Sequence, residues 1–184
     1  FKVKVTKKAR YVTDDCVGCG LCSEACVMSD KFADEFDEEL RKRSAVYIPY
    51  PQAVPLPYII DPDDCLLLSR GKCTKKCAEA CPSDAIDFEQ KDEELTLDVG
   101  AVIMAPGFEA YDARKKSEYG YGRYPNVVTS LEFERVLSAS GPFEGHVLRP
   151  SDREEPTKVA WIQCVGSRDN TIGNDYCSSV CCTY

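Results

Sequence analysis

Long apolar runs are absent from this sequence of 184 residues. No stretch approaches the roughly 18 apolar residues of a membrane-spanning helix. The first residues, Phe1-Lys2-Val3-Lys4-Val5, also lack the apolar core of a signal peptide. We therefore expect a soluble, cytoplasmic protein without a membrane span.

An excess of positive charge is absent as well. The sequence has 31 acidic and 23 basic residues, a net charge of −8 at pH 7 and a pI near 4.8. This balance argues against nucleic acid or an anionic membrane surface as the main partner. Hydrophobic residues at 43% and charged residues at 29% are ordinary globular values, which exclude a disordered or low-complexity chain. At about 150 residues per domain, the length predicts one or two domains.

Cysteine is the residue present in excess, with 12 cysteines against a single histidine, His146, which we expect at the surface. Disulfide-rich chains are typically short and secreted, and this sequence shows no export signal. The cysteine spacing therefore has to decide which chemistry is present, and it separates the cysteines into three groups.

The first group is Cys16, Cys19, Cys22 and Cys26, with the spacing C-x2-C-x2-C-x3-C. Three thiolates on one short loop can reach three corners of a [4Fe–4S] cubane, while the fourth points away to a different cluster. Gly18 and Gly20 allow the tight turns of such a loop. A tetrahedral zinc site has its ligands in pairs, so this evenly stepped run favours an iron–sulfur cluster.

The second group is Cys65, Cys73, Cys77 and Cys81, followed by Pro82. Its ending, C-x3-C-P, resembles the second half of bacterial two-cluster ferredoxins, in which the last cysteine of each run ligates the cluster of the other run. The resemblance implies one cluster held by Cys16, Cys19, Cys22 and Cys81, and another held by Cys65, Cys73, Cys77 and Cys26. The sequence departs from that family in having Val27 after the first run instead of Pro, and x7 and x3 spacings in the second run.

The third group is Cys164, Cys177, Cys181 and Cys182, with the spacing C-x12-C-x3-C-C. The adjacent Cys181 and Cys182 cannot face the same way from a strand, although both can reach one cluster from a turn or a helix start. On spacing alone, zinc, a redox disulfide and a further cubane all remain open.

The two ends of the ferredoxin-like part carry matching strand patterns. Residues 1–5 and residues 94–99 both alternate apolar and polar side chains, which is typical of half-buried strands. We expect residues 1–10 and 91–99 to be neighbours in one sheet, interrupted by a self-contained insertion at 11–90.

Between the first two cysteine groups, residues 30–43 place Phe32, Phe36 and Leu40 four residues apart, which predicts an amphipathic helix. The proline-rich stretch 47–58 must be extended. It is either an arm that covers a cluster with Tyr47, Tyr50 and Tyr58 or an ordinary connector.

The rest of the chain contains three further expected elements. Residues 99–107 and 158–164 predict buried apolar strands, the second with Trp161 in the sheet core. Thr129 and Glu132 form a capping box that predicts a helix from Leu131 to about Ser138. A Gly-x-Gly-x-x-Gly dinucleotide fingerprint is absent.

The stretch from Asp98 to Gly107 resembles the strand of thioredoxin-reductase-like flavoproteins that passes the FAD diphosphate, with Pro106 in the place usually held by Thr. The resemblance implies flavin contacts at Ala105, Pro106 and Gly107. Together with the ferredoxin-like part and with Trp161-Ile-Gln-Cys164 before the last cysteines, the sequence is similar to the A subunit of heterodisulfide reductase over essentially all of its residues.

That resemblance implies an α+β architecture, in which a two-cluster ferredoxin-like unit (11–90) is inserted into a fragment of a thioredoxin-reductase-like α/β flavoprotein domain (1–10 and 91–184). It implies a third [4Fe–4S] cluster at the third cysteine group, FAD in the full-length protein, and other oxidoreductase subunits and ferredoxin as partners. The chain is then an internal piece of a longer, flavin-based electron-bifurcating oxidoreductase, and acts as an electron relay without catalytic residues of its own.

Two other functions compete with this interpretation. One is a zinc-stabilised interaction module without a redox role. The other is a stand-alone ferredoxin with a structural tail.

Overall fold

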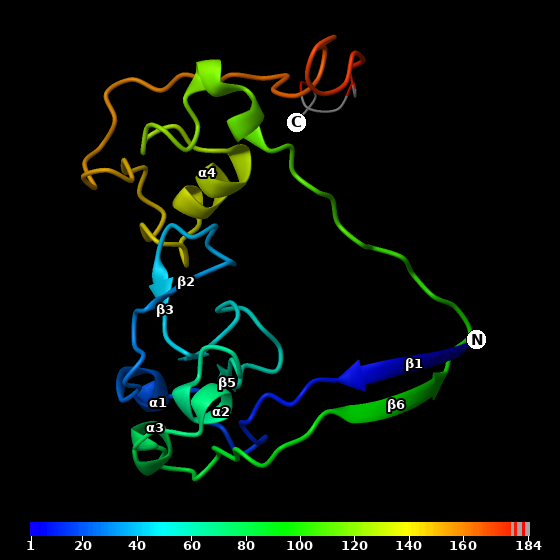
Figure 1. Ribbon diagram of the computed structural model, residues 1–184, viewed down its shortest axis with the longest axis vertical. Coiled ribbons are helices and arrows are strands. Elements are labelled where there is room, and N and C mark those ends of the chain that lie inside the picture. The colour runs from blue at the N-terminus through cyan, green and yellow to red at the C-terminus, as the bar shows by residue number, and fades with distance from the viewer. Residues whose placement is uncertain (178, 180–181, 183–184) are drawn as a thin grey trace. The chain divides into compact units, whose positions relative to one another are not determined.

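The chain forms two compact units, Phe1–Met104 and Ala105–Tyr184. A computed structural model describes residues 1–177, 179 and 182, and its elements are short helices and strands joined by long loops (Figure 1). This mixture confirms the expected α+β class. Cys181 lies outside the described residues. In the part of the chain that is described, no helix combines the length and the apolar character needed to cross a membrane.

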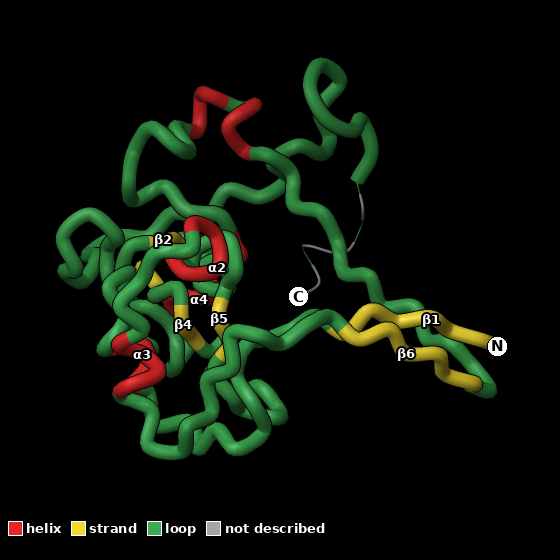
Figure 2. The backbone as a smooth tube through the Cα atoms, turned by 60° about the horizontal axis from the view of Figure 1, so that its bottom comes forward, coloured by secondary structure: helices red, strands yellow, loops and turns green. Residues whose placement is uncertain are grey.

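A two-stranded antiparallel ribbon joins the two ends of the first unit. Strand β1 (Lys2–Lys7) pairs with β6 (Glu93–Asp98), and Val5 lies opposite Leu95. The ribbon extends away from the cysteine-bearing body of the unit (Figure 2). At its base, the Ala9 amide donates to the Asp92 carboxylate at 2.9 Å. The predicted neighbourhood of residues 1–10 and 91–99 is therefore confirmed.

Two short helices begin in the same way and carry one buried cysteine each. Helix α1 (Leu21–Glu24) follows Gly20, and α3 (Lys76–Glu79) follows Lys75, both residues having left-handed backbone angles. Helix α2 (Leu66–Arg70) begins directly after Cys65. An antiparallel bridge between Val12 and Ile86 closes this body by joining the segments before the first and after the second cysteine group.

The excursion between the cysteine groups forms two small ladders. Strand β2 (Phe32–Ala33) pairs with β3 (Lys42–Arg43), and β4 (Val46–Tyr47) pairs with β5 (Ile59–Ile60). Between β4 and β5 the proline-rich stretch contains no helix or strand, as its composition predicted.

The predicted helix over 30–43 is wrong. The Asp34 carboxylate accepts hydrogen bonds from the backbone amides of Phe36 and Asp37 and thereby stabilises a turn. Glu38 and Glu39 have φ angles of 50° and 62°, which no right-handed helix accommodates. A short polar side chain thus competes successfully with helical hydrogen bonding.

The second unit contains two 3-10 turns, η1 (Ala113–Lys115) and η2 (Ser117–Tyr119), and the helix α4 (Ser130–Leu137). The predicted capping box is confirmed, because the Glu132 amide donates to the Thr129 hydroxyl at 3.2 Å and the Glu132 carboxylate accepts from the Thr129 amide.

Two predicted buried strands are wrong. Residues 99–107 and 158–164 form no strand, and Ile103 and Trp161 are 92% and 67% exposed. A buried strand needs hydrogen-bonded neighbours and cover on both faces, and the described residues offer neither segment a pairing strand. Trp161 instead packs edge-on against Phe133 of α4, with ring centroids 4.7 Å apart.

The capping box can be tested through Trp161, the only tryptophan of the chain. We expect Thr129→Ala to lower the free energy of unfolding of the second unit by about 1 kcal/mol, because the Glu132 amide at the start of α4 loses the hydroxyl that accepts its hydrogen bond. Trp161 fluorescence during urea unfolding measures the change. Thr157→Ala, at an exposed threonine, is the control, and equal unfolding of both variants would contradict the role of the cap.

Candidate metal centres

The first two cysteine groups line two separate cavities in the first unit. One cavity, partly open to solvent, is lined by Cys16, Cys19, Cys22 and Cys81. The other, also partly open, is lined by Cys26, Cys65, Cys73 and Cys77. The chain thus brings together the two interleaved sets of four that the ferredoxin resemblance implies. Their role as ligands is taken up below as a proposal.

The interleaving follows from where the helices end. Helix α1 carries Cys22 and stops before Cys26, whose amide donates to the Ser23 carbonyl at 3.3 Å. The chain has therefore turned away from the helix axis at Cys26, and this side chain reaches the second cavity. The equivalent turn after α3 carries Cys81 to the first cavity.

The sulfur atoms have distinct surroundings. Burial raises the pKa of the Cys22 thiol to about 12 and that of Cys77 to about 11. Burial also acts to raise the pKa of Cys81, but hydrogen bonds from Ala85 and Ser83 outweigh it and lower the pKa. Because the thiolate is the nucleophile, thiols with raised pKa values are poor nucleophiles. A metal that binds at Cys22 or Cys77 therefore has to displace the thiol proton.

Backbone amides donate to the cysteine that each run sends to the other cavity. The Met28 amide lies 3.4 Å from Cys26 Sγ, and the Ala85 amide lies 3.3 Å from Cys81 Sγ. Hydrogen bonds of this kind stabilise negative charge on sulfur and raise the potential of a bound iron–sulfur cluster.

Tyr58 covers the loop of the first cysteine group. A Cβ atom added at Gly20 would lie 3.0 Å from the Tyr58 hydroxyl oxygen, and Gly20 has a φ of +87°. Tyr58 also lines the first cavity. The arm interpretation thus agrees with the position of Tyr58, whereas Tyr50 stacks on Phe36 with ring centroids 5.1 Å apart.

A buried arginine, which the sequence pattern did not reveal, holds the segment that leads to Cys65. The side chain of Arg43 is 6% exposed and pairs with Glu35, Asp61 and Asp64 at 2.9, 3.1 and 2.9 Å. Its guanidinium also lies 4.0 Å from the centre of the Tyr47 ring. Tyr47 therefore packs on Arg43 and does not line either cavity. The run of acids directly before Cys65 was the available signal for such a cation.

The Arg43 contacts fix the start of α2. The Cys65 amide donates to the Asp61 carbonyl at 2.9 Å, and Asp64 directly precedes Cys65. Arg43 therefore ties β3 to the segment that positions Cys65, the cysteine that the long x7 spacing separates from the rest of its group.

The third cysteine group lies in the second unit, where Cys164 is half-buried and Cys177 and Cys182 are exposed. The Arg168 amide donates to the Tyr176 carbonyl at 3.2 Å, which draws the segments after Cys164 and before Cys177 together. Cys182 Sγ contacts Gln163 Oε1 at 3.6 Å. These contacts bring the three described cysteines into one region. Their service as metal ligands, with Cys181, stays a prediction.

The expected flavin contacts lie in an extended, exposed stretch. Ala105, Pro106 and Gly107 belong to no helix or strand. Their contact with FAD stays a prediction. His146 is exposed, as expected.

No family model matches the chain, but curated relatives match it from end to end. It is 50% identical over 185 aligned residues to the A subunit of H(2):CoB-CoM heterodisulfide,ferredoxin reductase of Methanothermobacter thermautotrophicus. It is 47% identical to the iron-sulfur A subunit of CoB--CoM heterodisulfide reductase of Methanocaldococcus jannaschii. It is 46% identical to the A subunit of Ferredoxin:CoB-CoM heterodisulfide reductase of Methanosarcina mazei.

The chain spans about a quarter of the length of these relatives, 27% of the first two and 22% of the third. All three are named as subunits of reductases, that is, of oxidoreductases. Over its whole length the chain is homologous to one segment of the A subunit of heterodisulfide reductase, which confirms the family resemblance drawn from the cysteine pattern.

The role of Arg43 can be tested by substitution. Arg43→Met leaves three carboxylates without their shared cation, and breaking such a buried ion pair costs roughly 3 kcal/mol. We expect a lower midpoint in anaerobic urea unfolding, followed by far-ultraviolet circular dichroism. Arg43→Lys should fall between Arg43→Met and the unchanged protein, because lysine cannot present a planar fork to several carboxylates. The control is Lys42→Met at the exposed neighbour in β3. The same unfolding midpoint for Arg43→Met and Lys42→Met would show that the ion pairs of Arg43 do not stabilise the fold.

Proposed function

We propose that this chain carries single electrons through [4Fe–4S] clusters, as part of a heterodisulfide-reductase-like, flavin-based electron-bifurcating oxidoreductase. The observation that carries the proposal is the segregation of eight cysteines into two cavities in the interleaved pattern of a two-cluster ferredoxin.

The donor set fits polynuclear clusters better than single zinc ions. A zinc ion binds four ligands at about 2.0 to 2.3 Å and so draws their side chains tightly together. Among the residues that the structure describes, no three Cys, His, Asp or Glu side chains are arranged to hold one metal ion. Four cysteine thiolates around one cavity are the ligand set of a [4Fe–4S] cluster.

The chain's own residues would hold such clusters and control their surroundings. A [4Fe–4S] cluster supplies reversible one-electron chemistry when bound. The cysteines bind it, Tyr58 and Phe88 line the two cavities and limit access of water, and the Met28 and Ala85 amides donate to sulfur. Burial and these hydrogen bonds are the means by which a protein sets a cluster potential.

We infer that residues 11–90 are a ferredoxin-like insertion in a flavoprotein domain formed by 1–10 and 91–184. The pairing of β1 with β6 supports this, because an inserted domain needs its two ends close together, and the Ala9 amide contacts Asp92 at that point. In the full-length protein, Ala105, Pro106 and Gly107 then contact FAD. Cys164, Cys177, Cys181 and Cys182 hold a third cluster.

The proposal extends to the partners. The relatives are named subunits, and ferredoxin appears in the names of those from Methanothermobacter thermautotrophicus and Methanosarcina mazei. We propose that other subunits of a cytoplasmic complex and ferredoxin exchange electrons with the protein that contains this chain.

Metal analysis of anaerobically purified protein tests the cluster assignment. We expect a brown protein with roughly twelve iron and twelve sulfide per chain for three cubanes. Cys77→Ala and Cys177→Ala should each remove about four iron, whereas Thr74→Ala, at an exposed residue between two ligands, should remove none. Colourless protein with bound zinc and no sulfide would support the zinc module instead. Unchanged iron in Cys177→Ala would exclude a cluster at the third group.

Removal of the clusters should unfold the first unit. Its described buried apolar side chains in one cluster are Val12, Val46, Ile60 and Ala85 together with cysteines, a core too small to compensate for the loss of ligand bonds. We expect the amides of Val46 and Ile60 to lose hydrogen-exchange protection after oxidation and chelation of the iron. Retained protection in iron-free protein would show that the apolar core suffices.

A further inference from the structure

Residues 70–76, here called the cationic loop, concentrate positive charge in an acidic chain. The loop contains Arg70, Lys72, Lys75 and Lys76, and no acidic residue occurs from Cys65 to Ala78. Of the acids that flank this stretch, Asp64 is already paired with Arg43. Asp63 and Glu79 are left to offset the four charges within the neighbouring sequence, so the local charge is positive although the chain carries −8.

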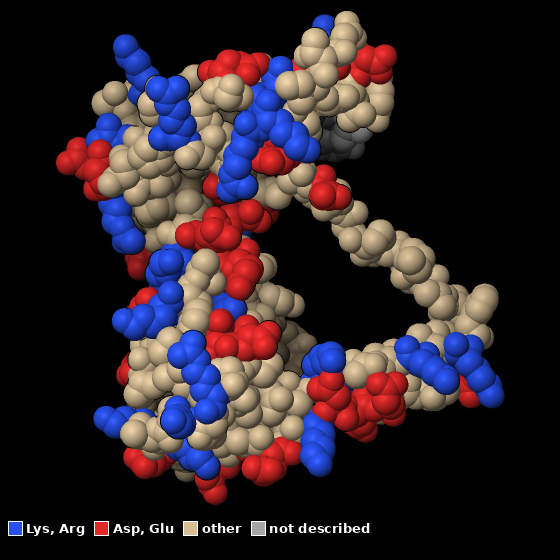
Figure 3. Space-filling view, viewed as in Figure 1, with Lys and Arg blue, Asp and Glu red and all other residues tan. Residues whose placement is uncertain are grey.

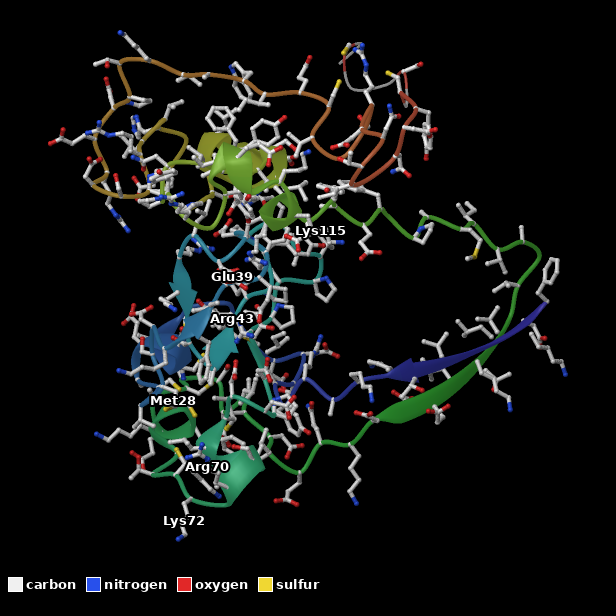
Figure 4. All side chains as sticks on the ribbon, turned by 45° about the horizontal axis from the view of Figure 1, so that its top comes forward. Met28, Glu39, Arg43, Arg70, Lys72 and Lys115 are labelled. Carbon is white, nitrogen blue, oxygen red and sulfur yellow. The ribbon has the colours of Figure 1, made fainter. Side chains whose placement is uncertain are left out.

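These charges face solvent. All four side chains belong to exposed residues, and none makes an ion pair with another described residue. Lys7 and Lys8, at the base of the β1–β6 ribbon, differ, because they pair with Glu93 and Asp92. Figure 3 shows blue side chains gathered over α2 and α3, and in Figure 4 the Lys72 side chain points away from the chain.

The cationic loop lies at the wall of the second cavity. Cys73 is part of the loop, and Lys76 and Cys73 both line the cavity, together with Met28. The first cavity has the opposite surroundings. No lysine or arginine occurs between Arg10 and Lys31, whereas Asp15 and Glu24, acids without an ion pair among the described residues, lie beside the cysteines of that stretch.

Local charge of this kind selects partners at short range. The Debye length is about 8 to 10 Å at physiological ionic strength, so a docking protein responds to the face it approaches rather than to the net charge of the chain. A positive face attracts an acidic partner and raises its association rate, and this effect weakens as salt is added.

We propose that the cationic loop is the docking face for an acidic, one-electron carrier protein, which exchanges electrons through the second cavity. The inference rests on the proposed function, because it takes a cluster at Cys26, Cys65, Cys73 and Cys77 as the electron's entry or exit point. One electron leaves the reduced carrier and reduces that cluster, or passes in the reverse direction. No bond forms or breaks, and no proton moves.

The test uses the intact, anaerobically purified protein and an acidic two-cluster ferredoxin as the probe. Calorimetry measures binding of oxidised ferredoxin, and stopped-flow absorbance measures electron transfer from reduced ferredoxin, both over a range of salt concentrations. We expect Arg70→Glu with Lys72→Glu to weaken binding and slow transfer at least about tenfold at low salt, and to remove most of the salt dependence.

The matched control is Lys2→Glu with Lys4→Glu, at exposed positions of β1, which changes the net charge by the same amount. This control should bind ferredoxin within about twofold of the unchanged protein. Arg70→Gln with Lys72→Gln places no acid at the end of α2. Its affinity for ferredoxin should lie between those of the charge reversal and the unchanged protein. Arg70→Lys with Lys72→Arg keeps both positive charges and should bind ferredoxin as the unchanged protein does.

Equal effects of the two charge reversals would overturn the docking face, as would binding of anionic phospholipid vesicles without binding of ferredoxin. Iron and sulfide analysis of each variant separates this result from the fate of the proposed function. Folded, zinc-loaded protein without iron or sulfide that binds oxidised ferredoxin through the cationic loop would refute the relay and retain the docking face. Protein that contains its clusters but binds ferredoxin equally well with and without the charges of the cationic loop would retain the relay and refute the docking face.

Discussion

The convergence of eight cysteine side chains on two cavities is the constraint on which the first unit depends. The buried cluster at its centre combines Cys22, Cys65 and Cys77 with a few small aliphatic residues. Interiors of ordinary domains are filled by apolar side chains at high density. In this unit, sulfur atoms occupy positions that an ordinary core gives to leucine or phenylalanine, so the proposed cluster binding would link the energy of folding to the metal group.

The same constraint explains why the helices are so short. Helices α1 and α3 have four residues each, which is too few for an isolated helix to be stable. Each helix supplies a buried cysteine to one cavity, and the turn after it supplies a cysteine to the other. A longer helix would keep both side chains on one face and would destroy the interleaving. The two cavities are therefore coupled through the chain, since neither can be formed without the helix end that serves the other.

Features encoded by nearby residues could be predicted from the sequence, and those that need distant partners could not. The cysteine grouping, the alternation in β1 and β6 and the Thr129 capping box are local patterns, and the structure contains each arrangement. The strands expected at 99–107 and 158–164 failed because strand formation needs neighbours that periodicity does not reveal. Arg43 was missed for a related reason, since its burial depends on carboxylates 18 and 21 residues away. The failed helix over 30–43 has the same origin, because the turn at Asp34 brings β2 beside β3 and so carries Arg43 toward Asp61 and Asp64.

Two groups of basic residues show how surroundings decide the use of a charge. Arg43 is buried among three carboxylates, and its charge is consumed in holding the segment before Cys65. Arg70 and Lys72 lie a few residues after Cys65, at exposed positions and without ion-pair partners among the described residues. Removing two charges from water costs free energy, so a buried ion pair persists only where the surrounding structure holds both partners. An exposed charge without a partner contributes little to stability, but it attracts or repels an approaching molecule. One buried cation thus fixes the segment that leads to Cys65, whereas the exposed cations are the ones that, in the proposed docking, meet the partner.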